Sequence, residues 1–81
     1  MERAELLDAL KANIQTIVAQ VVDSEIVEHK SMKDLGADSL EMVEVVSRTM
    51  KQFKIRVPRT ELSKAQNIGQ LLDLLERHAS A

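Results

Sequence analysis

Apolar residues recur every three or four positions in several stretches of the chain, the spacing that keeps them on one side of an α-helix. The first such stretch runs from about Arg3 to Val22 and should end near Asp23 and Ser24, two residues that favour leaving a helix. We therefore predict a long amphipathic helix there. Its apolar stripe comprises Leu7, Leu10, Ile14, Val18 and Val21, widened by Leu6 and Ile17. The polar residues that fall mostly on its other side are Lys11, Asn13, Gln15 and Gln20.

A second helix is predicted from Ser39 to about Gln52. Asp38 is a preferred helix N-cap, and Glu41 completes a capping box with it. The predicted inner stripe comprises Leu40, Val43, Val46, Met50 and Phe53. The residues that must then face water are Glu41, Glu44, Arg48 and Lys51. Met42 and Val45 are apolar but lie beside that stripe. We expect Val45 in the core and leave Met42 open between the core and a partner-facing apolar spot.

The residues from Asp23 to Ala37 show no sustained period, which predicts a loop that is long for so small a protein. We expect its apolar residues to anchor it under the helices, namely Ile26, Val27, Met32 and Leu35. Ser31 to Asp34 should form one isolated helical turn. His29 is expected to be an ordinary surface residue.

After the second helix, polar and apolar residues alternate from Lys54 to Pro58, and the proline favours an extended Val57. A very short third helix is expected over Thr60-Glu61-Leu62-Ser63. Asn67 and Gln70 form a second capping box. The apolar spacing of Ile68, Leu71, Leu72 and Leu75 predicts a helix from there to about His78, which suits the negative end of the helix dipole. The tail from His78 onward should fray.

No segment is typical of a strand and nothing repeats internally, so the predicted fold class is all-α. We expect an antiparallel bundle of three main helices plus one short helix, with a long first loop. The length of 81 residues predicts a single domain over residues 1–81. Because Phe53 is the only aromatic residue, its core should be aliphatic.

Composition and charge exclude several classes of function. The chain has no cysteine, which rules out disulfides and zinc–thiolate sites. No apolar run approaches the roughly 20 residues of a membrane span and no signal peptide is evident, so a cytoplasmic protein without membrane contact is expected. The net charge is −2, but the charges are segregated. An acidic block comprises Asp34, Asp38, Glu41 and Glu44. A basic run, interrupted by Glu61, comprises Arg48, Lys51, Lys54, Arg56, Arg59 and Lys64.

Ser39 is the residue whose position suggests chemistry. It lies in the first turn of the predicted second helix, where unpaired backbone N–H groups and the positive dipole end favour a phosphate group. A catalytic serine needs a base within reach, but His29 lies in a loop and His78 near the far end of the chain. No glycine-rich phosphate loop and no metal-binding spacing is present. We therefore expect no catalytic residue, no metal site and no enzymatic activity.

The string Leu35-Gly36-Ala37-Asp38-Ser39-Leu40-Glu41 closely resembles the modification site of the acyl carrier protein family, L-G-[AIL]-D-S-[LIV]-[DE]. The resemblance covers nearly the whole chain and implies the same helical fold. It implies that Ser39 carries a 4′-phosphopantetheine arm, moved from coenzyme A by a phosphopantetheinyl transferase. The thiol of the arm would hold acyl groups as thioesters for partner enzymes.

The same resemblance assigns roles to the neighbours of Ser39. Asp38 corresponds to the residue before the modified serine, which helps the transferase and its metal to engage. Leu40, Glu41 and Glu44 correspond to positions that partner enzymes commonly touch, with Met42 beside them.

Charge separates this chain from the carriers of bacterial fatty-acid synthesis, which it otherwise resembles. Those carriers are acidic along the second helix and the loop after it. Here the same region is basic and would repel the basic docking patches of fatty-acid-synthesis enzymes, through Arg48, Lys51, Lys54, Arg56 and Arg59. This favours a polyketide carrier. Asp38 also resembles acyl carriers rather than the peptidyl carriers of nonribosomal synthetases, which often have histidine there.

The span from Val57-Pro58-Arg59 to Asn67-Ile68-Gly69 resembles free-standing carriers of polyketide β-branching cassettes, which hand acetyl groups to an HMG-CoA-synthase-like enzyme. The partners implied are a ketosynthase, an acyltransferase or an HMG-synthase-like enzyme. The start at Met1 and the tail lead us to expect a free-standing protein, acting as a monomer.

Three alternatives stay open at this point. One is a fatty-acid-synthesis carrier, and another is an unmodified interaction module of the same fold in which Ser39 is only part of a helix cap. The basic run from Arg48 to Lys64 also suggests a small nucleic-acid-binding module. The lack of aromatic residues and the adjacent acidic block argue against that last reading, so no nucleic-acid partner is expected.

Overall fold

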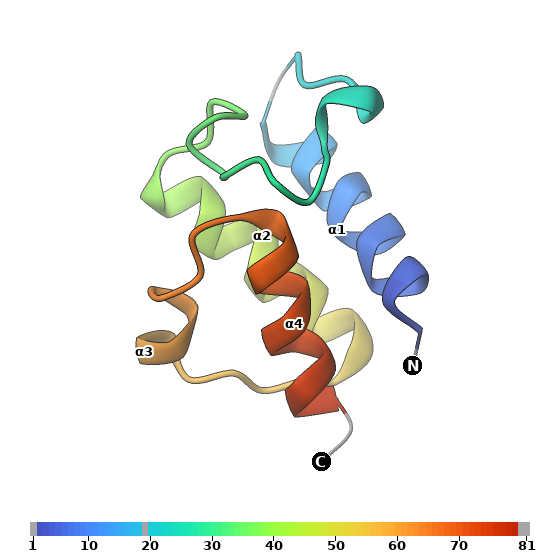
Figure 1. Cartoon of the computed structure of the whole chain (residues 1–81), viewed down its shortest axis with the longest axis vertical. Coiled ribbons are helices and arrows are strands. Elements are labelled where there is room, and N and C mark those ends of the chain that lie inside the picture. Colours follow the sequence, from blue (N-terminus) through green and yellow to red (C-terminus); the bar gives the residue numbers. More distant parts are fainter. Residues whose placement is uncertain (1, 19, 80–81) are drawn as a thin grey trace.

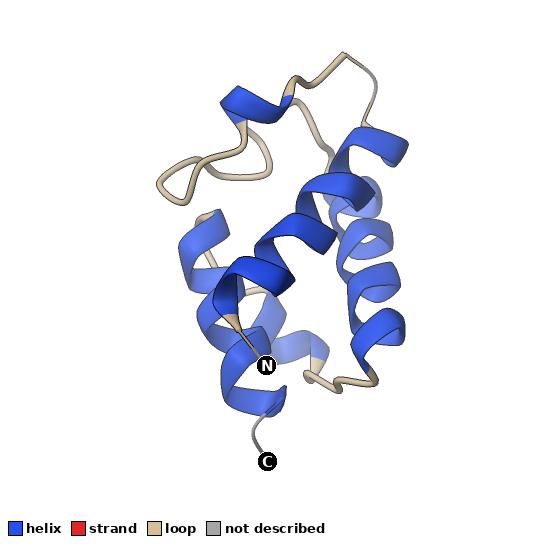
Figure 2. Ribbon diagram, turned by 90° about the vertical axis from the view of Figure 1, so that its right-hand side faces the viewer, coloured by secondary structure: helices blue, strands red, loops and turns tan. Residues whose placement is uncertain are grey.

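The computed structural model describes residues 2–18 and 20–79, and within them all regular structure is helical (Figures 1 and 2). The elements are α1 (Arg3–Ile17), the 3-10 helix η1 (Asp23–Glu25), α2 (Ser39–Phe53), α3 (Arg59–Leu62) and α4 (Ile68–Ala79). Helix α1 packs against α2 and α4, and the short α3 contacts α4. The predicted fold class, three main helices plus a short one with a long first loop, is confirmed. Across this part of the chain no helix is long and apolar enough to cross a membrane.

The core is aliphatic, as expected, and every main helix and both long connections contribute to it. Phe53 lies at its edge, half-buried. The buried apolar residues are Leu6, Leu10, Ile14, Val18, Ile26, Met32, Leu35, Ala37, Val45, Val46, Ile55, Val57, Ile68, Leu71, Leu72 and Leu75. Three of the four expected loop anchors, Ile26, Met32 and Leu35, are among them, and Val27 is half-buried.

Helix α1 ends at Ile17, and the prediction that it continues to Val22 is wrong. Thr16, Ile17 and Val18 are β-branched, which lowers helix propensity, and Val18 already has extended dihedral angles. Gln20 then adopts a positive φ of 71°. The last residue of the predicted apolar stripe, Val21, therefore lies beyond the helix but is half-buried against the core, whereas Val22 is 53% exposed.

Asn13 was placed with the polar residues of the outer face, and the structure contradicts this. It is buried on the side of α1 that faces α2, where its Nδ2 donates to Thr49 Oγ1 (2.8 Å) and Gln52 Oε1 (3.1 Å). Thr49 Oγ1 in turn donates to the Val45 carbonyl (3.0 Å). Because these partners satisfy it, an amide is tolerated in the core.

The inner face of α2 is also turned relative to the prediction. Val45, Val46 and Thr49 are buried, whereas Leu40 is 81% exposed and Val43 only half-buried. Leu40 and Val45 are separated by about 140° around a helix axis, so they cannot share one narrow face. The expectation for Val45 is confirmed. Met42 is half-buried and packs against the core.

Hydrogen bonds hold the middle and the second half of the long loop, from Glu28 to Leu35. The N–H of Ser31 donates to Asp34 Oδ2 and the N–H of Asp34 donates to Ser31 Oγ, both at 3.0 Å. Leu35 N–H donates to the Ser31 carbonyl (3.3 Å), which confirms the isolated helical turn. The carbonyls of Lys30 and Glu28 accept from Ile68 N–H (2.8 Å) and Gly69 N–H (2.9 Å), so the loop caps the start of α4.

The second half follows the predicted order closely. Ile55 and Val57 are buried while Lys54 and Arg56 are exposed, as the alternation indicated. Asn67 Oδ1 accepts from Gln70 N–H (2.8 Å), but the Gln70 side chain accepts from Gln66 N–H (2.7 Å) rather than from Asn67 itself. Helix α4 continues to Ala79, so fraying does not begin at His78. Residues 80 and 81 of the expected tail lie outside the described range.

Candidate functional site

Two local features determine where α2 begins, a glycine turn and a capping box. Gly36 has a φ of +86°, which a side chain would strain, and it turns the chain toward Asp38. The capping box is confirmed, because Glu41 N–H donates to Asp38 Oδ1 (2.7 Å) and Asp38 N–H donates to Glu41 Oε1 (3.0 Å). These bonds fix Ser39 as the first residue of the helix.

Ser39 is exposed at this helix start, beside two backbone donors that have no acceptor among the described residues. The capping box satisfies the N–H groups of Asp38 and Glu41, which leaves those of Ser39 and Leu40. Together with the positive end of the helix dipole, they favour an anion at this point.

An open hollow of about 450 Å³ adjoins the serine, lined by Lys33, Gly36, Ala37, Asp38 and Ser39. The Lys33 side chain brings a positive charge to this hollow, and the prediction from sequence missed it. The Gly36 N–H donates to the Lys33 carbonyl (2.9 Å), so one turn carries both residues that line the hollow. The sequence signal for Lys33 was a cation shortly before the Leu-Gly pair. An exposed hydroxyl, two unbonded N–H groups and a cation fit a phosphodiester attached to Ser39.

The structure places neither histidine beside Ser39. His29 is exposed in the long loop, and His78 lies near the end of α4 with its Nε2 3.1 Å from Glu61 Oε2. Neither lines the hollow at Ser39. In residues 2–18 and 20–79 there is no group of three or more histidine, cysteine or acidic side chains that could hold a metal ion.

The residues predicted to meet partner enzymes divide between two flanks of α2. Leu40 and Glu44 are both exposed and, four residues apart, lie on one outer face with Ser39 at its end. Glu41 is half-buried and occupied in the capping box. Met42 lies on the other flank, where it lines a cavity of about 180 Å³ together with Met32 and Leu71.

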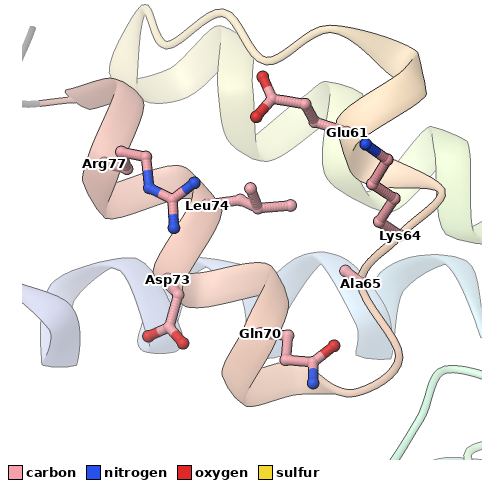
Figure 3. Close-up of a pocket in the computed structure, with 7 residues that line it drawn as sticks. All are labelled: Glu61, Lys64, Ala65, Gln70, Asp73, Leu74 and Arg77. Carbon is pink, nitrogen blue, oxygen red and sulfur yellow. The ribbon is translucent and has the colours of Figure 1, made fainter.

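A separate pocket of about 330 Å³ lies between α3 and α4 and contains none of the predicted site residues (Figure 3). Leu74 points from α4 into the space between the two helices. The lining residues are Glu61, Lys64, Ala65, Gln70, Asp73, Leu74 and Arg77.

Two carboxyl groups of the long loop have lowered pKa values. Hydrogen bonds from Arg3 lower the pKa of Glu28, whose Oε1 lies 2.6 Å from Arg3 Nη2. Arg3 also pairs with Asp73 and Glu76 on α4, and its own pKa is raised, first by the hydrogen bond to Glu28 and then by those to Asp73 and Glu76. The backbone N–H and then the hydroxyl of Ser31 lower the pKa of Asp34. Both carboxylates therefore support the loop that leads to Ser39.

Comparison with known proteins defines the class. Residues 8–75 match the family model described as the phosphopantetheine attachment site. The chain belongs to this family: it is an acyl carrier protein, its cofactor is covalently attached 4′-phosphopantetheine, and it works with partner enzymes.

Individual relatives agree with this class over almost the full chain. The polyketide biosynthesis acyl-carrier-protein AcpK of Bacillus subtilis is 27% identical over 75 residues, covering 93% of this chain and 92% of its own. An acyl carrier protein of Helicobacter pylori is 32% identical over 72 residues, covering 84% and 92%. A chain in the crystal structure of the curacin biosynthetic pathway HMG synthase in complex with acetyl donor-ACP is 34% identical. It superposes with a TM-score of 0.80 over 91% of this chain and 95% of that chain.

Proposed function

We propose that Ser39 carries the 4′-phosphopantetheine arm and that this carrier delivers acyl groups in polyketide biosynthesis. The observation that carries the proposal is the exposed Ser39 hydroxyl beside the unbonded N–H groups of Ser39 and Leu40. When attached, the arm supplies a terminal thiol that holds acyl groups as thioesters.

The residues around Ser39 have separate tasks in this proposal. Ser39 Oγ forms the phosphodiester, and the two N–H groups with Lys33 offset its negative charge. Asp38 uses Oδ1 to cap the helix. Its Oδ2 has no partner in the described part of the chain and is available to a phosphopantetheinyl transferase and its metal.

The polyketide assignment rests on charge and on the relatives. Five cations between Glu44 and Thr60 are exposed and make no ion pair within residues 2–18 and 20–79, namely Arg48, Lys51, Lys54, Arg56 and Arg59. An enzyme with a basic docking patch would be repelled by them. AcpK is a carrier of polyketide biosynthesis, and its likeness to this chain supports the assignment.

Within polyketide biosynthesis we propose an acetyl donor for an HMG-synthase-like enzyme, with a ketosynthase or acyltransferase as further partners. The likeness to the chain crystallised with the curacin HMG synthase supports this choice. A single carrier domain over residues 1–81, a monomeric state and a cytoplasmic location stay predictions.

The test offers the acetyl-loaded protein to the curacin HMG synthase and, separately, to a fatty-acid ketosynthase. We expect transfer to the first, seen as loss of the acetyl mass from the carrier, and poor turnover with the second. Ser39→Ala serves as the variant that accepts no arm, and Arg48→Glu should improve turnover by the fatty-acid enzyme because it removes one repulsive cation. Efficient elongation by the fatty-acid enzyme with the unchanged sequence would assign this carrier to primary metabolism.

A further inference from the structure

The surface is hollowed at the end of α2 opposite Ser39, where the chain turns into the extended segment 54–58. One hollow, of about 470 Å³, is lined by Ser47, Met50, Lys51, Lys54, Ile55 and Arg56. A second, of about 490 Å³, is lined by Met50, Ile55, Arg56, Val57, Pro58 and His78. The two hollows adjoin each other at Met50, Ile55 and Arg56, which line both, and we call them together the distal groove.

Local structure explains why this groove has an apolar floor. Lys54 adopts a left-handed conformation with a φ of 55°, and Ile55 N–H donates to the Met50 carbonyl (2.9 Å), which ends α2 and reverses the chain. Ile55 and Val57 then point into the core with Met50 half-buried beside them. Pro58 extends this apolar floor.

The rim of the groove is positively charged and lacks internal counter-charges. Lys51, Lys54 and Arg56 are exposed, and none makes an ion pair within the described ranges. No carboxylate lines either hollow. The nearby Glu61 contacts His78 instead, at 3.1 Å. Lys51 also suits the negative end of the α2 dipole, but Arg56 lies beyond the helix and has no such role.

We propose that the distal groove docks an acidic segment of the partner enzyme. Apolar side chains of that segment would cover Met50 and Ile55, and its carboxylates would face Lys51, Lys54 and Arg56. Charge complementarity favours an acidic partner. The apolar floor favours a segment that also has apolar side chains, which a plain polyanion lacks. The inference rests on the proposed function, in which the carrier delivers its acyl group to an enzyme.

The position of the groove suits a second contact that leaves the arm free. Helix α2 has 15 residues, so at a rise of 1.5 Å per residue Ser39 and the groove lie roughly 20 Å apart along its axis. Figure 1 shows the segment after α2 at the opposite end of that helix from the loop that leads into it. Contacts at both ends of one helix would fix the direction in which the carrier lies on the enzyme.

The first test measures acetyl transfer to the curacin HMG synthase as a function of carrier concentration. Arg56→Glu should raise KM by about five- to tenfold and change kcat less than about twofold, because rim charges act mainly on encounter and affinity. The matched control is Lys64→Glu, an exposed cation outside the groove, which should leave KM unchanged. The KM difference should shrink in about 0.5 M salt. Equal KM values for both variants would overturn the inference while transfer itself still upholds the proposed function.

The second test does not depend on acyl transfer. The unmodified, isotope-labelled protein is titrated with a synthetic peptide of alternating glutamate and leucine, and amide chemical shifts are followed by NMR. Shifts that cluster at Met50, Ile55 and Arg56 and vanish in Arg56→Glu support the groove. Shifts spread over all basic residues, or equal shifts with a single-stranded oligonucleotide of the same charge, would contradict it. The titration tests whether the groove binds an acidic segment even if the wild-type protein transfers no acetyl group to the synthase.

Discussion

Asp38 and Ser39 are neighbours with different physical roles, and substitution separates them. Asp38 accepts the Glu41 N–H at 2.7 Å and anchors the helix start, whereas the Ser39 hydroxyl takes no part in the capping hydrogen bonds. We predict that Asp38→Ala lowers the free energy of unfolding by about 1 kcal/mol and that Asp38→Asn lowers it less. Ser39→Ala should change it little, as measured by urea denaturation. A loss in Ser39→Ala equal to that in Asp38→Ala would show that the serine is part of the cap.

The buried amide of Asn13 is a second residue whose role can be measured. Its bond to Thr49 Oγ1 joins α1 to α2 inside the core. Asn13→Ala should cost about 1–3 kcal/mol of stability because a buried hydrogen bond is removed from one side. Combining Asn13→Leu with Thr49→Val should cost less than the sum of the single changes. Strict additivity in this cycle would contradict a direct coupling, and Gln15→Ala on the exposed face provides the control.

Individual residues could be predicted from the sequence where a short local motif identifies them. A turn and a helix cap are predicted within six positions by Gly36, Asp38 and Glu41, and the structure has both. Asn13 and Leu40 were misplaced because periodicity assigns polar residues outward and apolar residues inward. Periodicity does not take into account that Thr49 and Gln52 provide hydrogen-bond partners for the buried amide of Asn13. It also does not take into account that Leu40 precedes the packed part of α2.

The long first loop is the element whose stability should depend most visibly on pH. The folded-state pKa values of Glu28 and Asp34 lie below their ordinary values of 4.5 and 3.8. Such groups contribute stability that is fully present above the ordinary pKa and is lost as pH falls through the lower folded value. We therefore predict a falling thermal midpoint below about pH 4.5, with Glu28→Gln flattening that fall.

Thermal unfolding followed by circular dichroism from neutral to strongly acidic pH checks this prediction. Glu44→Gln is the matched control, since Glu44 is exposed and has no ion pair in the described part of the protein. The same pH dependence in Glu28→Gln and in the unchanged protein would rule out a contribution from the contact with Arg3.

Elements were predictable wherever a start signal and a period coincide, as in α2 and α4. The end of α1 was not, because no proline or glycine marks it. There the β-branched run at Thr16, Ile17 and Val18 and the backbone turn at Gln20 decide the outcome. The hydrogen bonds from the start of α4 to the loop carbonyls of Glu28 and Lys30 join segments far apart in sequence, which no local pattern reports.

On the scale of the whole molecule, the charge of the outer face of α2 changes along the helix. Leu40 and the acidic Glu44 lie near Ser39, and the cations lie farther along. Glu44→Lys should slow transfer to the cognate enzyme through the association rate, and more strongly at low salt, with little change in thermal midpoint. Met42→Ala, on the other flank, should lower stability because Met42 packs against the core. Stopped-flow association and thermal denaturation separate the two effects. Normal association of Glu44→Lys would place the interface elsewhere.

The fold class, the helix order and the candidate serine follow from periodicity, capping signals and one short motif. The distal groove could not be predicted from the sequence, because it depends on the left-handed turn at Lys54 that brings Met50, Ile55 and Arg56 together. Sequence showed the cations as a run, and the structure shows which of them border an apolar floor.

Attachment of the arm to Ser39 is the central claim and has a direct measurement. The unmodified protein is incubated with coenzyme A and a broad-specificity phosphopantetheinyl transferase, and the intact mass and the mass of the peptide that contains Ser39 are recorded. We predict the addition of one 4′-phosphopantetheine, located on Ser39, and none on Ser39→Ala with the helical circular dichroism spectrum unchanged. Addition to another serine, or no addition to the unchanged protein, would contradict the claim.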